Sequence, residues 1–438
     1  MEFYNVYNTK YAEIASRDEI YPMFKVDLLD HYENTLNDIT GYLSSENSGS
    51  ISVNYQQGVR RTCSFTLVDT EGEFIPSVDA PIWLNRKFKL YIGLQDIYTG
   101  DIYWFSQGVF CVTNPSIDRE TNSITLEGVD KYGFLGSETG YNQITVAHVI
   151  KENTPIPEAI KDTLMLDLGN GMVIDAIPPL IDVSLLDQKF PYEMEKAPTS
   201  YLADVFIEMG NVMGSDTYYD TDGHMRFDNG TMDMSYGSAD SIWDFHENSS
   251  EYLEPKLTLN TVDIINSVTI VGNNSDNTVT YTYTAENHNP ISKVSIENIG
   301  RKAYYEESSS VYNNDRAKDY AEYTLNQKSI MQETMDFSCP LLPHLDVNRV
   351  ITVTDDYYKF NKQRFIIQSL TIPLDTSSKM TITASNISSL PYYEFKEGSI
   401  KDTTHSSGSG GSSSGGSSGG SSGGSSGSGG SGSSGGGK

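Results

Sequence analysis

Three aspartates surround one glycine in residues 218–228, YYDTDGHMRFD, and carboxylates at this density can hold a metal ion. A calcium loop of the EF-hand kind needs oxygen ligands at positions 1, 3 and 5, glycine at 6 and glutamate at 12. With Gly223 at position 6, Asp220 and Asp222 fill positions 3 and 5, but Tyr218 and Asn229 occupy positions 1 and 12. Asp220 and Asp222 are therefore candidate metal ligands in an incomplete set.

The same segment also fits a β-hairpin. Asp222 and Gly223 stand between the runs 216–219 and 224–228, which contain β-branched and aromatic residues. Asp-Gly between such runs predicts a type I′ turn, because both residues tolerate positive φ. The sequence favours this structural turn over a calcium site, and it predicts no bound metal or cofactor.

Other catalytic signatures fail along the chain. The histidines are scattered outside any HExxH, CxxC or GxSxG context; no GK[ST] loop occurs, and no GxGxxG follows a strand pattern. Asp and Glu are abundant, but no spacing selects a glycosidase pair. Cys63, Cys111 and Cys339 lie far apart in apolar runs, which indicates buried thiols. The sequence predicts no catalytic residues.

The charge balance is strongly acidic, with 30 basic and 59 acidic side chains and a net charge of −29. This balance argues against ordinary binding to a phosphate backbone. The N-terminus lacks the pattern of a secretory signal, and no run of 18 apolar residues occurs, so we expect a soluble chain made in the cytosol. Residues 406–438 contain only Ser, Gly and one Lys, a composition that cannot fold alone. This tail is either a flexible tether or a segment held by neighbouring subunits.

Hydrophobic periodicity divides the chain into regions. Residues 21–135 alternate with period two, which predicts antiparallel strands. Residues 145–167 and 197–214 have helical patterns, the second with Thr199 or Ser200 as a cap and Gly214 as its end. Strand patterns return after residue 257, with a helix at 313–333 that Asn313 can cap.

Two segments, 107–130 and 362–386, share one plan. Each has an apolar strand, a link containing proline, an acidic turn and a strand alternating apolar and polar residues. The likeness suggests that one strand-pair design is used twice, once near each end of the folded region.

Three stretches together resemble the hub proteins of phage tails and baseplates. Residues 50–69 with 108–110 and 126–135 resemble the first hub domain, and residues 197–228 resemble a helix-then-hairpin element with an Asp-x-Asp-Gly turn. Residues 313–356 and 363–375 resemble the closing region, so the likeness covers roughly residues 20–390.

The resemblance implies an α+β, mainly β fold, in which two tail-tube-like antiparallel β-barrel domains flank a small α+β domain. The expected boundaries are an N-terminal arm at 1–20, a first barrel at 21–140, the α+β domain at 141–256, a second barrel with an inserted helix at 257–395 and a Gly/Ser-rich tail at 396–438.

The resemblance also implies a structural role. Such a protein forms a homotrimeric ring that adapts the hexameric tail tube to a threefold tip or spike and lines the exit for DNA. Its expected partners are the tail tube or distal tail ring, the C-terminus of the tape-measure protein and spike or fibre proteins. DNA would only pass through. The expected location is the tail tip or baseplate of a virion, assembled in the host cytoplasm.

Two other functions stay open from the sequence. One is the spike-base protein of a contractile injection or secretion system, which would share the architecture. The other is a tail-associated cell-wall hydrolase that uses some of the carboxylates.

Overall fold

The structure is a computed structural model of the chain. It describes residues 9–387, except residues 45–48, 57, 76, 78–79, 84–85, 139–142, 170, 214, 229–239, 261, 274–279, 291, 309–310 and 330–331. The first residues of the predicted arm, Gly214 and Asn229, and the Gly/Ser-rich tail thus lie outside the described residues.

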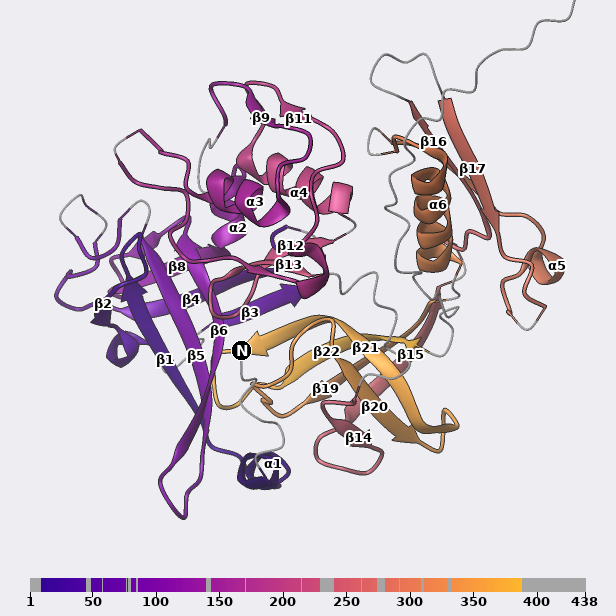
Figure 1. The fold of residues 1–438 in the computed structure, drawn as a ribbon. Coiled ribbons are helices and arrows are strands. Elements are labelled where there is room, and N and C mark those ends of the chain that lie inside the picture. The colour runs from indigo at the N-terminus through magenta and orange to yellow at the C-terminus, as the bar shows by residue number, and fades with distance from the viewer. Residues whose placement is uncertain are drawn as a thin grey trace, which may run out of the picture. The chain divides into compact units, whose positions relative to one another are not determined.

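The chain is mainly β, and its largest element is one 14-stranded sheet (Figure 1). The first β region follows helix α1 (Thr9–Ala15) and supplies eight strands, with a short 3-10 helix, Thr40–Tyr42, after the second. These strands are β1 (Pro22–Leu29), β2 (Thr35–Asp38), β3 (Gly49–Asn54), β4 (Arg61–Val68), β5 (Lys87–Gln95), β6 (Ile102–Val112), β7 (Ser116–Asp118) and β8 (Ser123–Asp130).

The closing β region supplies the other strands of this sheet. They are β14 (Asp244–His246), β15 (Leu253–Asn260), β19 (Gln332–Cys339), β20 (Val350–Asp355), β21 (Phe360–Pro373) and β22 (Met380–Asn386). Because β14 and the start of β15 pair within this sheet, the closing region begins before residue 257, where the sequence analysis placed the boundary.

A small α+β domain lies between the two β regions in sequence and has its own apolar core. Its helices are α2 (Lys131–Leu135), α3 (Ile156–Leu164) and α4 (Leu202–Met213), with a 3-10 turn at Val183–Leu185. Its strands are β9 (His148–Ile150), β10 (Leu180–Ile181), β11 (Met194–Lys196), β12 (Asp216–Tyr219) and β13 (Met225–Asp228). Helix α4 buries Leu202, Val205, Phe206 and Met209, the face that the sequence predicts.

The helix predicted over 145–167 is shorter in the structure. Only α3, residues 156–164, is helical, and residues 148–150 form strand β9, which pairs with β11. Pro155 precedes the first helical residue, and a residue before proline disfavours the helical conformation. The β-branched residues Val149 and Ile150 suit the strand.

Residues between β15 and β19 form a separate small unit. Strands β16 (Ser267–Asn273), β17 (Thr280–Glu286) and β18 (Ala303–Glu307) make a three-stranded sheet, with helix α5 (Ile296–Ile299) before β18. Helix α6 (Asn314–Lys328) packs on this sheet through Ala317 and Ala321. The Asn313 side chain accepts a hydrogen bond from the Arg316 amide, which confirms the predicted cap.

The two β regions repeat one strand order. The first contains the order β3-β4-β8-β6-β5-β1, and the closing region contains the order β15-β19-β22-β21-β20-β14. With the short strands β2 and β7 left out and the remaining six strands of each region numbered along the chain, both read 2-3-6-5-4-1. The strand pair that the sequence suggests is used twice is therefore part of a larger repeat, although β14 pairs in parallel where β1 pairs antiparallel.

A direct strand pairing joins the two regions. Strand β21 pairs antiparallel with β3, placing Leu370 opposite Val53 and Ile372 opposite Ile51 (Figure 1). All four side chains are buried in one apolar core that draws on both β regions. Within the described residues, no helix is long and apolar enough to cross a membrane.

Truncating Leu370 tests the shared core. We expect Leu370→Ala to lower the free energy of unfolding by about 2–5 kcal/mol, the usual loss for a buried leucine. Hydrogen exchange should accelerate in β4 and β8 as well as in β19 and β22, because the core is common. Val183→Ala, at a residue that is 80% exposed, is the control and should change stability by less than about 0.5 kcal/mol. Unchanged exchange in β4 and β8 would show that the regions are independent.

Candidate functional site

The Asp-Gly hairpin that the sequence predicts is present. Strands β12 and β13 pair antiparallel, with Tyr219 opposite Met225, so the loop comprises residues 220–224. This loop is longer than the predicted two-residue type I′ turn, and only Gly223 in it has positive φ, at +88°. The reason is Asp220, whose carboxylate accepts hydrogen bonds from the amides of Asp222 and His224 at 3.0 Å each.

The two candidate metal ligands contact protein groups. Asp220 Oδ1 accepts both loop amides, and burial raises the pKa of the Asp220 carboxyl. Asp222 Oδ1 lies 3.2 Å from Lys89 Nζ. Among the described residues, no three His, Cys, Asp or Glu side chains cluster in a way that could hold a metal ion. In this structure, the aspartates shape and anchor the turn.

The turn is pressed against the first β region. A Cβ atom at Gly223 would lie 2.9 Å from Val109 Cγ2 and 3.0 Å from Glu33 Oε2, so only glycine fits without a shift. The Ser106 hydroxyl donates to the Thr221 carbonyl. The hairpin thus connects the α+β domain to strand β6.

A buried lysine lies beneath this turn. Lys131 Nζ donates to the Gly223 carbonyl at 2.8 Å, lies 2.7 Å from Asp175 Oδ2 and forms a further ion pair with Glu33. Lys87 completes the group, since its Nζ lies 3.2 Å from Glu33 Oε1 and donates to the His31 carbonyl at 2.8 Å. Two cations therefore meet two carboxylates in a buried site, which compensates their charges.

The groups around this cluster add no further charge. Burial lowers the pKa of His31, whose Nε2 lies 2.7 Å from the Val173 carbonyl. Burial also raises the pKa of Tyr219, and its hydroxyl donates to Asp175 at 2.9 Å. Both side chains are therefore neutral at ordinary pH, and the cluster keeps its balance.

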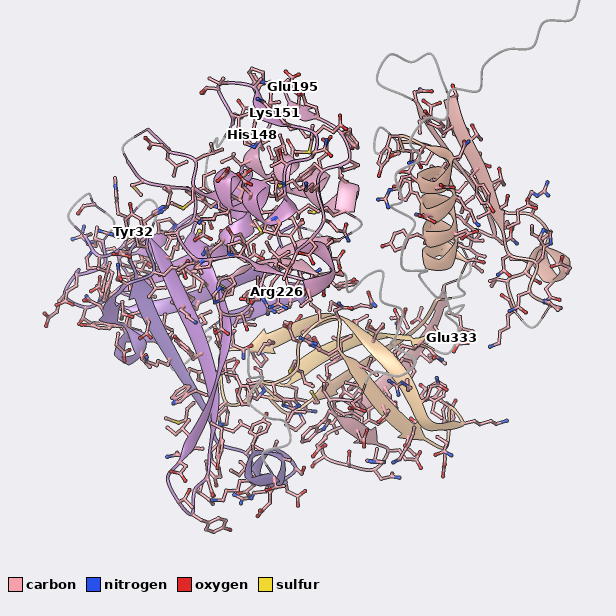
Figure 2. The ribbon with its side chains drawn as sticks, viewed as in Figure 1. Tyr32, His148, Lys151, Glu195, Arg226 and Glu333 are labelled. Carbon is pink, nitrogen blue, oxygen red and sulfur yellow. The ribbon has the colours of Figure 1, made fainter. Side chains whose placement is uncertain are left out.

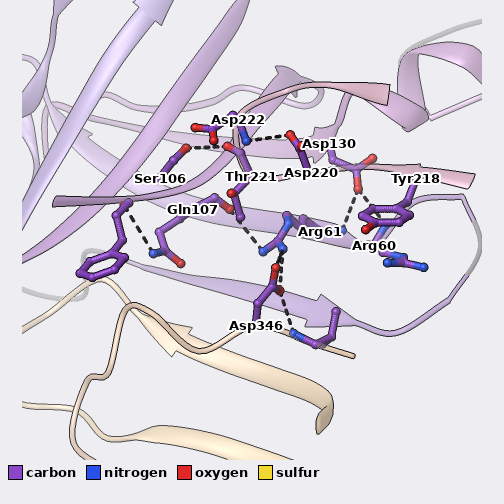
Figure 3. A network of polar contacts seen from close by, with 12 residues as sticks. Arg60, Arg61, Ser106, Gln107, Asp130, Tyr218, Asp220, Thr221, Asp222 and Asp346 are labelled. Atoms are coloured by element: carbon purple, nitrogen blue, oxygen red, sulfur yellow. Dashed lines mark hydrogen bonds and ion pairs between the residues drawn. The ribbon is translucent and has the colours of Figure 1, made fainter. Parts of the chain in front are cut away.

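A pair of arginines connects all three parts of the chain (Figure 3). Arg61 Nη2 lies 2.6 Å and 2.7 Å from the two carboxylate oxygens of Asp346, in the closing β region. Gln107 of β6 supports this contact by donating from Nε2 to the Pro343 carbonyl at 2.9 Å. Because Arg61 is buried, the ion pair is shielded from water.

Arg60 points to the α+β domain. Its guanidinium carbon lies 3.5 Å from the centre of the Tyr218 ring and 4.9 Å from that of Tyr55, an arrangement typical of cation–π contacts. Arg60 Nη2 also lies 3.3 Å from Asp216 Oδ2, to which the Tyr55 hydroxyl donates at 2.8 Å. Arg226, labelled in Figure 2, lies opposite Tyr218 on the same face of the hairpin and pairs with Asp228 at 3.2 Å.

Asp130 holds the backbone of the arginine pair. Its Oδ2 accepts the amides of Arg60 and Arg61 at 2.7 Å and 2.9 Å, and its Oδ1 accepts the amide of Tyr132 at 3.0 Å. Burial outweighs these hydrogen bonds and raises the pKa of Asp130 to about 6.

Sequence reasoning found the turn but missed the charges beneath it. Asp222 and Gly223 lie at the joint, whereas Lys131, Glu33 and the arginine pair were not singled out. Two signals were available: adjacent arginines at a strand start in an acidic chain, and a lysine directly before the run Tyr-Gly-Phe-Leu at 132–135.

Removing the buried cation tests the first cluster. We expect Lys131→Met to cost about 3–5 kcal/mol in the free energy of unfolding, because Asp175 and Glu33 lose their compensating charge. Lys89→Met is the matched control, since it contacts the same turn through a partly exposed pair and should cost at most about 1 kcal/mol. Equal losses in urea unfolding would contradict a special role for Lys131.

Asp130 should make stability depend on pH. Its folded pKa is raised from 3.8 to about 6, so its protonated form favours folding. This contribution is complete below about pH 4 and is lost as the pH rises through 6, a change of about 3 kcal/mol at 1.36 kcal/mol per unit. We expect the stability advantage of the natural chain over Asp130→Asn to shrink by that amount between pH 4 and 7. A constant difference in unfolding free energy would refute this assignment.

Comparison with known proteins gives a fold likeness. No protein-family model matches the chain, and no curated protein matches it in sequence. Two solved structures are similar at a TM-score of 0.53. The tail protein from Neisseria meningitidis MC58 is 9% identical, and the match covers 83% of this chain and 96% of that one. The 43 kDa tail protein of prophage MuSo2 from Shewanella oneidensis is 11% identical, with 84% and 100% covered.

A prophage tail protein from Listeria monocytogenes EGD-e also aligns, with 13% identity, a TM-score of 0.47 and coverage of 83% of this chain and 94% of that one. The fold of this chain is similar to that of the tail protein from Neisseria and the prophage tail protein from Shewanella, as the resemblance in its sequence predicts.

Proposed function

We propose that this chain is the structural hub of a phage tail tip or baseplate. Three copies form a ring that adapts the hexameric tail tube to a threefold tip or spike. The ring lines the exit for DNA and holds the C-terminus of the tape-measure protein, without catalytic residues of its own. It belongs at the tail tip of the virion and assembles in the host cytoplasm.

The observation that carries this proposal is the repeated strand order 2-3-6-5-4-1 in the two β regions. A ring can match a sixfold partner only through six nearly equivalent surfaces. Each β region would serve as one tube-like barrel module, so three chains would supply six. The pairing of β3 with β21 supports this reading, because it already joins two such modules edge to edge within one chain.

One face of the sheet suits the wall of a DNA channel. A row of hydroxyl side chains crosses five neighbouring strands, each residue directly opposite the next: Ser338, Thr381, Thr371, Ser52 and Thr62. The neighbouring rows carry the carboxylates Asp336 and Glu127. Lys256 lies directly opposite Asp336 on one of these rows. Hydroxyls and carboxylates outnumber this cation on the rows named here, so phosphates would find little to hold them and DNA would pass.

The buried charges fit a structural role. Lys131 and the two arginines are paired with carboxylates from other parts of the chain. Such pairs fix the first β region against the α+β domain and against the closing β region, which is what a load-transmitting ring requires. The partners we propose are the tail tube or distal tail ring above the hub and spike or fibre proteins below it.

The number of copies tests the proposal. We expect the chain, mixed with its tail-tube neighbour, to form a complex containing three copies, measured by native mass spectrometry. The hub ring alone should weigh three times the 48.5 kDa of one chain in light scattering. A ring with another number of copies, or no ring in the presence of the neighbour, would overturn the proposal.

A further inference from the structure

Each strand of one β region has a counterpart in the other. Strands β3, β4 and β8 correspond to β15, β19 and β22 in the repeated order. The register agrees at the level of residues, because Phe65 opposite Leu126 corresponds to Phe337 opposite Ile382. Every contact of one region therefore has an expected counterpart in the other.

The register makes β3 and β15 equivalent edge strands. Ile51 lies opposite Cys63 on β4, and Leu257 lies opposite Met335 on β19. Because Cys63 and Met335 are each two residues before the aligned phenylalanines, Ile51 and Leu257 hold the same position. β3 pairs on its other side with β21, whereas β15 is the end strand of the sheet order.

The register also makes β7 equivalent to the end of β21. Ser116 of β7 lies opposite Thr125 of β8, and Thr371 of β21 lies opposite Thr381 of β22. Thr125 directly precedes Leu126, and Thr381 directly precedes Ile382, the two residues aligned above. Ser116 and Thr371 therefore hold the same position. The end of β21 pairs additionally with β3, whereas β7 has only β8 as a partner strand among the described residues.

Exposed apolar side chains lie at the open edges of both β15 and β7. Val53 and Ile372 are fully buried at the junction of β3 with β21. Their counterparts are Leu259, which is 51% exposed, and Ile117, which is 50% exposed. Apolar positions that are buried at the junction inside the chain are therefore exposed at the edges of β15 and β7.

We propose that β15 of one copy pairs antiparallel with β7 of a neighbouring copy, repeating the pairing of β3 with β21. The register inside the chain, Ile51 opposite Ile372 and Ser52 opposite Thr371, sets the register between copies. It places three residues of β15 opposite three of β7: Leu257 opposite Ile117, Thr258 opposite Ser116, and Lys256 opposite Asp118.

Charge complementarity agrees with this register. Lys256 and Asp118 are both exposed, and they take the positions of Ser50 and Pro373, which lie opposite one another inside the chain. Opposite charges at directly opposed positions stabilise an antiparallel pair. Each copy carries one edge of each kind, so the contact is head to tail and closes into a ring when the rotation allows. This inference rests on the proposed hub ring and specifies the strand pairing that joins neighbouring copies within it.

Cysteine cross-linking tests the joint in assembled rings. The variants are Leu257→Cys with Ile117→Cys, and Thr258→Cys with Ser116→Cys. Consecutive pairs alternate between wide and close spacing, so one of the two variants brings its Cβ atoms within disulfide reach. The native thiols will not interfere, since Cys63, Cys111 and Cys339 are buried and burial raises their pKa.

We expect covalent dimers and trimers on a non-reducing gel from the matching variant. Thr258→Cys combined with Thr282→Cys, on the separate sheet of β17, is the control and should give no trimers.

Charge reversal supplies a second readout. Lys256→Asp or Asp118→Lys alone should weaken association of the ring by at least about fivefold, because like charges then oppose one another. The double variant should restore it. Lys161→Asp, on the exposed face of α3, is the control and should leave association unchanged.

The outcomes separate this inference from the proposed function. A threefold ring that gives neither cross-links nor charge-reversal rescue would overturn the joint while leaving the hub role intact. A chain that is absent from the tail tip would overturn the hub role itself.

Discussion

The strand pairing between β3 and β21 is the constraint on which the rest of the structure depends. Strand β21 is long enough to pair with β20 through its first half and with β3 through its last residues. A one-residue slip at this junction would turn Ile51 and Val53 out of the shared core. The register of both β regions in the one sheet is thus fixed by one strand.

The α+β domain is attached to this frame by charge and by close approach. Lys131 of α2 pairs with Glu33 of the first β region, and Arg60 reaches from that region to Asp216. Breaking a buried pair leaves an uncompensated charge, whereas an apolar contact of equal area would tolerate small shifts. The missing Cβ of Gly223 lets the turn approach β6 so closely that the lysine can reach its carbonyl.

Much of the local structure could be predicted from the sequence, because it depends on neighbours along the chain. Alternation in residues 50–67 predicts β3 and β4, and the Asn313 cap of α6 is as expected. The loop of the hairpin differs because the Asp220 side chain closes a longer turn. The short strand β9 was missed because its three residues fit a helical pattern equally well.

Long-range features needed coordinates. Nothing in residues 49–54 indicates that their partner lies at 369–373, since many strands share that alternation. The sequence context of Lys131 is unusual, but it does not show which carboxylates the lysine meets, because Glu33 and Asp175 are distant in sequence. The repeated strand pair is visible in the sequence, but the full repeated order requires knowing which strands are neighbours.

The unit of β16, β17, β18 and α6 leaves the main sheet at the end of β15 and returns at the start of β19. Asn260 lies opposite Gln332, so the chain departs and re-enters at adjacent points. A short hairpin turn could join the same two strands, and the unit has an apolar core of its own. This geometry makes the insertion a modular appendage, whose size and surface can change without altering the pairing of the strands in the main sheet.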